Sequence, residues 1–163
     1  AIFIGLGGAM AISPTVRAAV IQWITEWYET HIVYRYSGEN IQGEMPQYEI
    51  TGLPEGYQEI VRDIGPASVS VVYENGDHNS ICLDYTFMQE GAANLILAEG
   101  FQMEEVLVNG YEATFFIPDD PQDMSALTWI DLKENIQFTL NASLSKNDIL
   151  HIAENISLVE STK

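Results

Sequence analysis

Hydrophobic and polar residues alternate along much of the chain, which is the pattern of β-strands that bury one face. In residues 80–88, apolar side chains at every second position alternate with polar ones such as Cys82 and Asp84. Residues 69–74 have similar content, and the Asn-Gly-Asp sequence at 75–77 that joins the two stretches is typical of a hairpin turn. The pattern predicts an antiparallel strand pair.

Other short segments rich in β-branched and aromatic residues also predict strands. They are residues 32–36, 48–53, 94–98, 104–108, 111–117, 126–132 and 136–141. The clearest two-residue turn is Asn109-Gly110, because both residue types tolerate the positive φ angles of a tight hairpin. Strands joined by hairpins, without helical crossovers, imply an antiparallel sheet.

Helical patterns occur at both ends of the chain. The first helix is expected from Pro14 to about Tyr28, with Ser13 as its N-cap. Its apolar face has spacings of three and four residues and consists of Val16, Val20, Trp23, Ile24 and Trp27. Near the C-terminus, Ser145 and Asp148 form a capping-box pattern. The apolar face of that second helix consists of Ile149, Leu150, Ile152, Ala153 and Ile156.

Together these elements predict the α+β class. The expected architecture is an N-terminal amphipathic helix, a curved antiparallel sheet of about six to eight strands, and a C-terminal helix that packs on one face of the sheet. No repeat or long linker divides the chain, so one domain is expected.

Residues 1–12 read AIFIGLGGAMAI and carry no charge. A helix rises about 1.5 Å per residue, so this length is too short to cross about 30 Å of hydrocarbon. We interpret it as the end of a transmembrane or hydrophobic segment, followed by a juxtamembrane helix at 13–30 and a single extracytoplasmic domain at 31–163. A signal peptide with a cleavage site at residues 8–11 is the main alternative, and a buried core helix is another.

The aromatic residues of the first helix have two interpretations. Trp23, Trp27 and Tyr28 suit a belt at a membrane surface. The same stripe also suits the face of an element that packs on a sheet, which is the interpretation that we favour.

The charge balance narrows the classes of partner. Six Lys and Arg residues face 24 Asp and Glu residues, which gives a formal net charge of -18. Such a field repels phosphate, so neither nucleic acid nor a membrane docked through basic residues is expected as a partner. Cationic ligands and metal ions remain open, although the acidity also fits a surface that is simply soluble.

No established catalytic or metal-binding motif occurs in the sequence. His31, His78 and His151 lack ligand spacing, and Cys82 is the one cysteine, so no internal disulfide forms. Cys82 lies in an apolar run, which favours a buried thiol over a reactive one. The acidic loop at 119–123 could present oxygen ligands to Ca²⁺, but it lacks the glycine and distal glutamate of an EF-hand, so a solvated loop is favoured. No catalytic, cofactor or metal residue is assigned.

Several segments, taken in order, resemble one protein family. They are residues 53–57 (LPEGY), 72–76 (VYENG) with 81–84 (ICLD), 106–113 (VLVNGYEA), 128–131 (TWID) leading into 138–140 (FTL), and 144–145 (LS) with 149–156 (ILHIAENI). The chain resembles the Firmicutes domain of unknown function 4367 over about residues 13–158. Residues 141–143 (NAS) replace the glycine that usually precedes the last helix, which weakens the resemblance locally.

The resemblance implies an extracytoplasmic domain of a single-pass, anti-sigma-factor-like membrane protein of Gram-positive bacteria, and residues 13–20 and 26–28 look like the juxtamembrane helix of such proteins. It implies no catalytic residue. We therefore expect a non-enzymatic sensor or binding domain on the outer side of the cell membrane. An unknown protein or small molecule would be its ligand, and the first helix would report binding across an upstream transmembrane helix.

Two other functions stay open. A lipid- or peptide-carrying module would use the concave face of the curved sheet as its pocket. A hydrolase would need a convergent polar constellation that is assembled from distant residues. The sequence does not distinguish these from a sensor.

Overall fold

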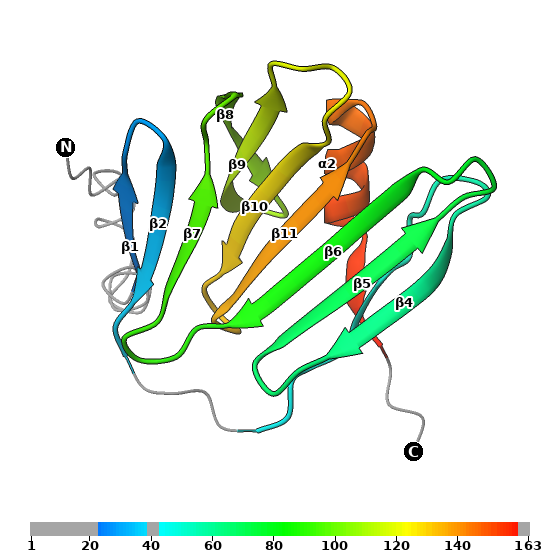
Figure 1. Cartoon of the computed structure of the whole chain (residues 1–163). Helices are drawn as coiled ribbons and strands as arrows, with labels where there is room; N and C mark the ends of the chain where they lie inside the picture. Colours follow the sequence, from blue (N-terminus) through cyan, green and yellow to red (C-terminus); the bar gives the residue numbers. More distant parts are fainter. Residues whose placement is uncertain (1–22, 39–42, 160–163) are drawn as a thin grey trace.

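The computed structural model describes residues 23–38 and 43–159 (Figure 1). Within these ranges the chain is mostly β, with one short helix near the C-terminus. The strands are β1 (Trp23–Trp27), β2 (His31–Tyr36), β3 (Tyr48–Ile50), β4 (Gln58–Ile64), β5 (Ser68–Glu74), β6 (Ser80–Phe87), β7 (Ala93–Leu97), β8 (Phe101–Val108), β9 (Tyr111–Pro118), β10 (Ser125–Asp131), β11 (Ile136–Ala142) and β12 (Ile156–Leu158). The helix is α2 (Lys146–Glu154).

The strands form three antiparallel sheets. Seven of them lie in the order β4-β5-β6-β11-β10-β9-β8, which agrees with the predicted size of the sheet. A second sheet has the order β1-β2-β7, and β12 pairs with β3 in a third. The predicted α+β class therefore fits in part: the large antiparallel sheet and the C-terminal helix are present.

One face of the seven-stranded sheet, here called the inner face, carries the main core. Alternate residues of β5, β6, β10 and β11 point into it, including Leu83, Leu127 and Leu140, which are fully buried. The helix α2 covers this face with Ile149 and Ile152. The short β3–β12 pair also packs here: Tyr48 and Ile50 of β3 belong to the buried cluster, and Ile156 of β12 is partly buried against it.

The opposite, outer face of the same sheet carries the β1-β2-β7 sheet. Trp23, Ile32 and Tyr34 pack there against Phe116 of β9, with Ala126 of β10 close by. Figure 1 shows this sheet on the side away from α2. Its core draws on β8, β9 and β10, and among the described residues no further layer covers the outer face of β4, β5 and β6.

A hydrogen bond from Trp23 Nε1 to Asn135 Oδ1, 2.7 Å long, joins β1 to the β10–β11 turn. Asn135 is buried and has a φ of 56°, a backbone conformation that asparagine tolerates in turns. Its Nδ2 has no hydrogen-bond partner among the described residues. The contact between the two sheets thus leaves one buried donor unpaired.

The predicted hairpins at 69–88 and 104–117 are confirmed. Asn109 and Gly110 have φ angles of 49° and 88°, as a two-residue turn with two positive φ values requires. The predicted final hairpin of β10 and β11 is confirmed as well.

The first predicted helix is wrong where the structure describes it. Trp23–Trp27 forms β1, which pairs antiparallel with β2, so the proposed boundary at residue 30 falls inside a hairpin. The five residues WITEW do not alternate between apolar and polar types, so their own pattern does not indicate a strand, and pairing with the β-branched and aromatic residues of β2 decides for one. Trp23 is buried and Trp27 partly buried against the large sheet, which agrees with the packing interpretation for the two tryptophans, whereas Tyr28 is exposed.

Smaller differences occur elsewhere. The edge strand β4 escaped the sequence analysis because most of its residues are exposed, three of the seven are charged, and a β-bulge interrupts its alternation. Ile156, predicted on the last helix, begins β12, because α2 ends at Glu154 with Asn155 as its C-cap. Residues 1–12 and the part of the first predicted helix up to residue 22 lie outside the described residues. Within the described ranges, no helix has the length and apolar character needed to cross a membrane.

The N-cap of α2 provides a test of the helix. The hydroxyl of Ser145 accepts a hydrogen bond from the Asp148 backbone N–H and donates to the Asp148 carboxylate at 2.6 Å. Replacing a serine N-cap by alanine costs about 1 kcal/mol. We predict that Ser145→Ala lowers the free energy of unfolding by about this amount in a urea titration, since α2 packs on the main core. Ser143→Ala, two residues earlier and also exposed, serves as the control and should change it by less than about 0.5 kcal/mol.

Candidate functional site

A row of polar side chains crosses the outer face of the seven-stranded sheet. Residues directly opposite each other on antiparallel strands point to the same face, so the register identifies the row. Crossing β4, β5, β6, β11, β10 and β9, its members are Asp63, Ser70, Asp84, Thr139, Thr128 and Thr114. We call this set the polar row. Such a continuous line of polar groups is unusual on a sheet face that another layer partly covers.

The end of the polar row on β9 and β10 is buried beneath the β1-β2-β7 sheet. Thr128 is 2% exposed, and its hydroxyl donates to the Phe138 carbonyl at 2.9 Å. Thr114 is also buried and makes a hydrogen bond with Tyr34 of β2. Burial raises the pKa of the Tyr34 hydroxyl, against an opposing effect of that hydrogen bond. This half of the row is therefore satisfied internally and holds the two sheets together.

Gln137 of β11 links the row to β7. It is 3% exposed, and its Oε1 accepts a hydrogen bond from Asn94 Nδ2 at 2.6 Å. Its Nε2 donates to Thr128 Oγ1 at 3.4 Å. A single buried amide thus connects the strand β7 with the covered half of the polar row.

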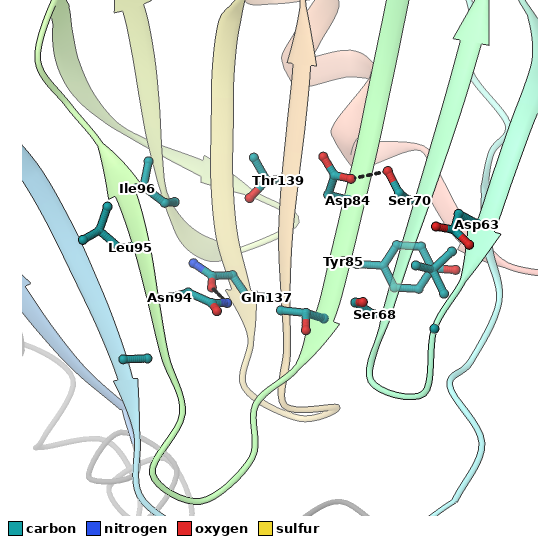
Figure 2. A pocket seen from close by; sticks show the side chains of 14 residues that line it. Asp63, Ser68, Ser70, Asp84, Tyr85, Asn94, Leu95, Ile96, Gln137 and Thr139 are labelled. Carbon is teal, nitrogen blue, oxygen red and sulfur yellow. Dashed lines mark hydrogen bonds between the residues drawn. The ribbon is translucent and has the colours of Figure 1, made fainter.

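The other half of the row opens into a groove of about 380 Å³ between β7 and the outer face of the large sheet (Figure 2). This volume lies in the range of ligand sites, which are about 300–1,000 Å³. From the large sheet, polar side chains line the groove, namely Asp63, Ser68, Ser70, Asp84, Thr86 and Thr139. Asn94, Leu95 and Ile96 of β7 line the other side. The groove is the candidate functional site.

At the centre of the groove, Ser70 Oγ donates to Asp84 Oδ1 at 2.5 Å. The hydrogen bond orients the carboxylate and leaves its second oxygen to accept from a ligand. None of the residues that line the groove is a histidine, lysine or arginine. The groove therefore offers carboxylate, hydroxyl and amide groups, which suit a ligand that donates hydrogen bonds or carries positive charge.

The histidines lie away from the groove. The His31 ring stacks on Tyr28 with 4.5 Å between centroids, and His78 Nδ1 lies 2.8 Å from a Glu74 carboxylate oxygen. His151 lies in the last turn of α2. The structure thus brings none of the three beside Ser70, and an imidazole base for a serine nucleophile would have to come from outside this set.

The other residues considered in the sequence have local roles. In the acidic loop, Asp120 accepts a hydrogen bond from the Gln122 backbone N–H at 2.9 Å and so closes its own turn. Among residues 23–38 and 43–159, no group of three potential metal ligands lies close enough together to hold an ion. Cys82 lies on the outer face of β6, and burial, aided by Asp84, raises the pKa of its thiol. A raised pKa keeps a thiol protonated and less reactive.

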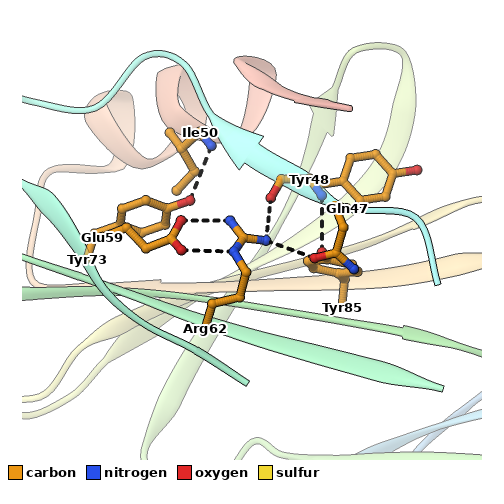
Figure 3. Close-up of polar contacts among 7 residues, drawn as sticks. All are labelled: Gln47, Tyr48, Ile50, Glu59, Arg62, Tyr73 and Tyr85. Atoms are coloured by element: carbon orange, nitrogen blue, oxygen red, sulfur yellow. Dashed lines mark hydrogen bonds and ion pairs between the residues drawn. The ribbon is translucent and has the colours of Figure 1, made fainter. Parts of the chain in front are cut away.

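A second polar cluster lies on the inner side of β4 (Figure 3). Arg62 donates to both carboxylate oxygens of Glu59, from Nε at 2.9 Å and from Nη2 at 2.7 Å. Residues three apart on a regular strand point to opposite faces, but the register shifts between Glu59 and Val61. This β-bulge turns both side chains to one face and makes the bidentate pair possible.

The same cluster fixes β3 over the inner face. Arg62 Nη1 donates to the Tyr48 carbonyl at 3.1 Å, while the hydroxyl of Tyr85 accepts from the Tyr48 N–H at 3.1 Å. The hydroxyl of Tyr73 accepts from the Ile50 N–H at 3.4 Å. Because these groups bind the protein's own backbone, the cluster has a structural role.

Sequence reasoning missed the groove. It identified the polar face of residues 80–88, which includes Asp84 and Thr86, but left it as ordinary surface. Ser70, Asn94, Gln137 and Thr139 are uninformative singly, because their alignment depends on strand order. A possible signal was the polar residue at every second position of both 68–70 and 137–141, within segments otherwise rich in apolar residues.

The Glu59–Arg62 pair predicts a pH effect. The hydrogen bond from Arg62 lowers the pKa of the Glu59 carboxyl below its ordinary value of 4.5, with partial burial acting in the opposite sense. Because the folded pKa is the lower one, the pair stabilises the protein fully above about pH 4.5 and loses its contribution as the pH falls through the folded value.

We predict that Glu59→Gln lowers stability at pH 7 and that the difference from wild type narrows below pH 4.5. Urea titrations of both proteins between pH 7 and pH 3 measure it. Glu55→Gln, at an exposed loop position, is the control. A difference that stays constant with pH would contradict the assignment.

Comparison with known proteins gives one match. No curated protein and no solved structure matches the chain. A family model described as a domain of unknown function, DUF4367, matches residues 47–156. This range includes the polar row, the polar cluster around Arg62 and α2. Since the match covers more than half of the sequence, the chain belongs to the DUF4367 family.

Proposed function

We propose that this protein is a sensor or binding domain, without catalytic activity, and that the groove between β7 and the outer sheet face is its ligand site. The observation that carries the proposal is the polar row, which is buried at Thr114 and Thr128 and reaches the groove at Asp84 and Ser70. Polar groups at this density on a sheet face need partners. Inside the interface the protein supplies them, and in the groove a ligand or water would.

The arrangement also suggests how binding would be reported. A ligand in the groove would touch β7 and the large sheet together, and Gln137 joins the two through Asn94. β7 pairs with β2, and β2 pairs with β1. Binding would therefore bias the position of the β1-β2-β7 sheet, which is the described part of the chain nearest to its N-terminal segment. This sheet replaces the helix that the sequence suggested as the transmitting element.

We also propose that the domain lies on the extracellular side of a cell membrane and belongs to a single-pass protein of the anti-sigma-factor type. Support comes from the uncharged apolar sequence at residues 1–12 and from the acidic composition, which suits a soluble exposed domain. The family resemblance described above has the same implication. The partner would be a protein or small molecule outside the membrane, and the transmembrane link would lie upstream of β1.

A carrier of lipids or peptides is the alternative that the groove itself brings forward, because Ile96 of β7 adds apolar surface to one of its walls. A hydrolase would instead need a nucleophile in the groove, for which Ser70, hydrogen-bonded to Asp84, is the candidate. If the protein is a hydrolase, it should turn over a substrate, and Ser70→Ala should abolish that turnover. Binding predicts a saturable complex without turnover.

We predict that at least one of three small probe molecules binds in the groove. The probes are a capped hexapeptide of alternating lysine and valine, tri-N-acetylchitotriose, and dihexanoylphosphatidylcholine below its micellar concentration. Backbone amide shifts in ¹H–¹⁵N spectra are the readout. At least one probe should shift β5, β6 and β7 residues of the groove, and Ser70→Val/Thr139→Val should weaken its binding about tenfold or more by removing two hydrogen-bonding groups.

Ser80→Val is the matched control, since Ser80 lies on the same face of β6 but outside the groove. It should leave the affinity unchanged. If none of the three probes perturbs groove residues, or if both variants weaken binding equally, the groove is not the ligand site.

A further inference from the structure

The strand β7 has a free edge that borders the groove. Within the described chain it pairs with β2 on one side only, and no backbone hydrogen bond of residues 93–97 to another strand is found on the other side. Residues 93–96 line the groove. A free strand edge presents N–H and C=O groups that can pair with an added strand.

This edge differs from the other edges of the two larger sheets. Proteins protect exposed edges with charges, prolines or bulges. β4 has a bulge and three charged residues, β8 has Glu104 and Glu105, and β1 has Glu26. β7, with the sequence ANLIL, has none of these features. An unprotected edge beside a groove is the arrangement expected of a site that accepts a strand.

We propose that the ligand of the groove is an extended, cationic peptide segment that pairs with the free edge of β7 as a fourth strand of the β1-β2-β7 sheet. The inference rests on the proposed function, because it takes the groove as the ligand site and adds the class of ligand. Neighbouring strands lie about 4.8 Å apart and stacked sheets about 10 Å apart, so such a strand would lie over the uncovered part of the outer face.

The pleat of β7 determines which ligand side chains face the polar row. Asn94 and Ile96 pair with Tyr34 and Ile32, whose side chains face the large sheet. The alternate residues Leu95 and Leu97 point away and are 56% and 69% exposed. A peptide paired with β7 would therefore direct every second side chain toward the polar row and the others beside these two leucines.

The residues that the inward and outward side chains of the peptide would meet then determine its expected sequence pattern. The inward positions meet Asp84, Ser70 and Asp63, and none of the described residues that line the groove is a lysine, arginine or histidine. Lysine or arginine suits these positions, while apolar residues suit the outward positions beside Leu95 and Leu97. The ligand should thus alternate cationic and apolar residues. A second copy of this chain is disfavoured as the occupant, since each copy carries a net charge of -18.

The capped lysine–valine hexapeptide is the probe, titrated against the whole chain by fluorescence anisotropy and by amide shifts. We expect saturable binding with shifts on β7. Asp84→Asn should weaken it at least fivefold, and Glu105→Gln, which removes the same charge from the outer face of β8, should not. Leu95→Lys should weaken it at least tenfold, and Leu107→Lys, at a 62% exposed leucine of β8, should not.

Backbone pairing is tested with the same peptide methylated on alternate amide nitrogens, in both possible phases. The peptide methylated in one phase should bind at least tenfold more weakly, and the peptide methylated in the other phase should keep its affinity. The reason is that only alternate amides of a strand face the β7 edge. Equal binding to all four protein variants, or equal loss in both phases, would overturn the proposal in favour of unspecific attraction to an acidic protein.

The outcomes also separate this inference from the proposed function. Groove shifts with the chitotriose or the phospholipid, without any from the peptide, would overturn the peptide and leave the groove as a ligand site. Absence of groove shifts with all probes would overturn both. Thermal unfolding of each variant verifies that it is folded, and peptide-induced dimers in sedimentation would overturn the assignment of a single peptide strand to the edge.

Discussion

The register of β5, β6, β11 and β10 is the constraint on which both faces of the large sheet depend. Side chains alternate along a strand, so a slip by one residue would exchange the two faces. In the observed register, Val71, Leu83, Leu140 and Leu127 lie in line on the inner face and are fully buried. The neighbouring positions place the polar row on the outer face. Burial of the inner line therefore also fixes the geometry of the groove.

The two polar clusters of the molecule serve different ends. Around Arg62, donors and acceptors meet within the protein, and a bulge and two tyrosine hydroxyls hold β3 on the inner face. On the outer face, Asp84 and Ser70 satisfy one another but also line open space. This contrast, rather than the mere presence of charge, singles out the groove in a protein with 24 acidic residues.

The elements that sequence reasoning found are those whose information is local. Asn109-Gly110 specifies its turn, and Ser145 with Asp148 specifies the start of α2. The strand β1 was mistaken for a helix because its identity depends on β2, and β4 was missed because its bulge interrupts the alternation. The groove depends on still longer separations, since Asn94 meets Gln137 and Asp63 lines up with Thr139 only after the strands are ordered. No spacing in one sequence contains that order.

The contact between Trp23 and Asn135 has a consequence for how the molecule opens. The β1-β2-β7 sheet has a much smaller buried cluster than the inner face, and its junction leaves the Asn135 Nδ2 without a partner. Leaving a buried donor unpaired costs about 1–3 kcal/mol of stability. If the junction separated, water could accept a hydrogen bond from this donor and the cost would be recovered. Hydrogen exchange should therefore be fastest in β1, β2 and β7, with the seven-stranded sheet still intact. The small sheet would then behave as a separate cooperative unit whose detachment precedes global unfolding.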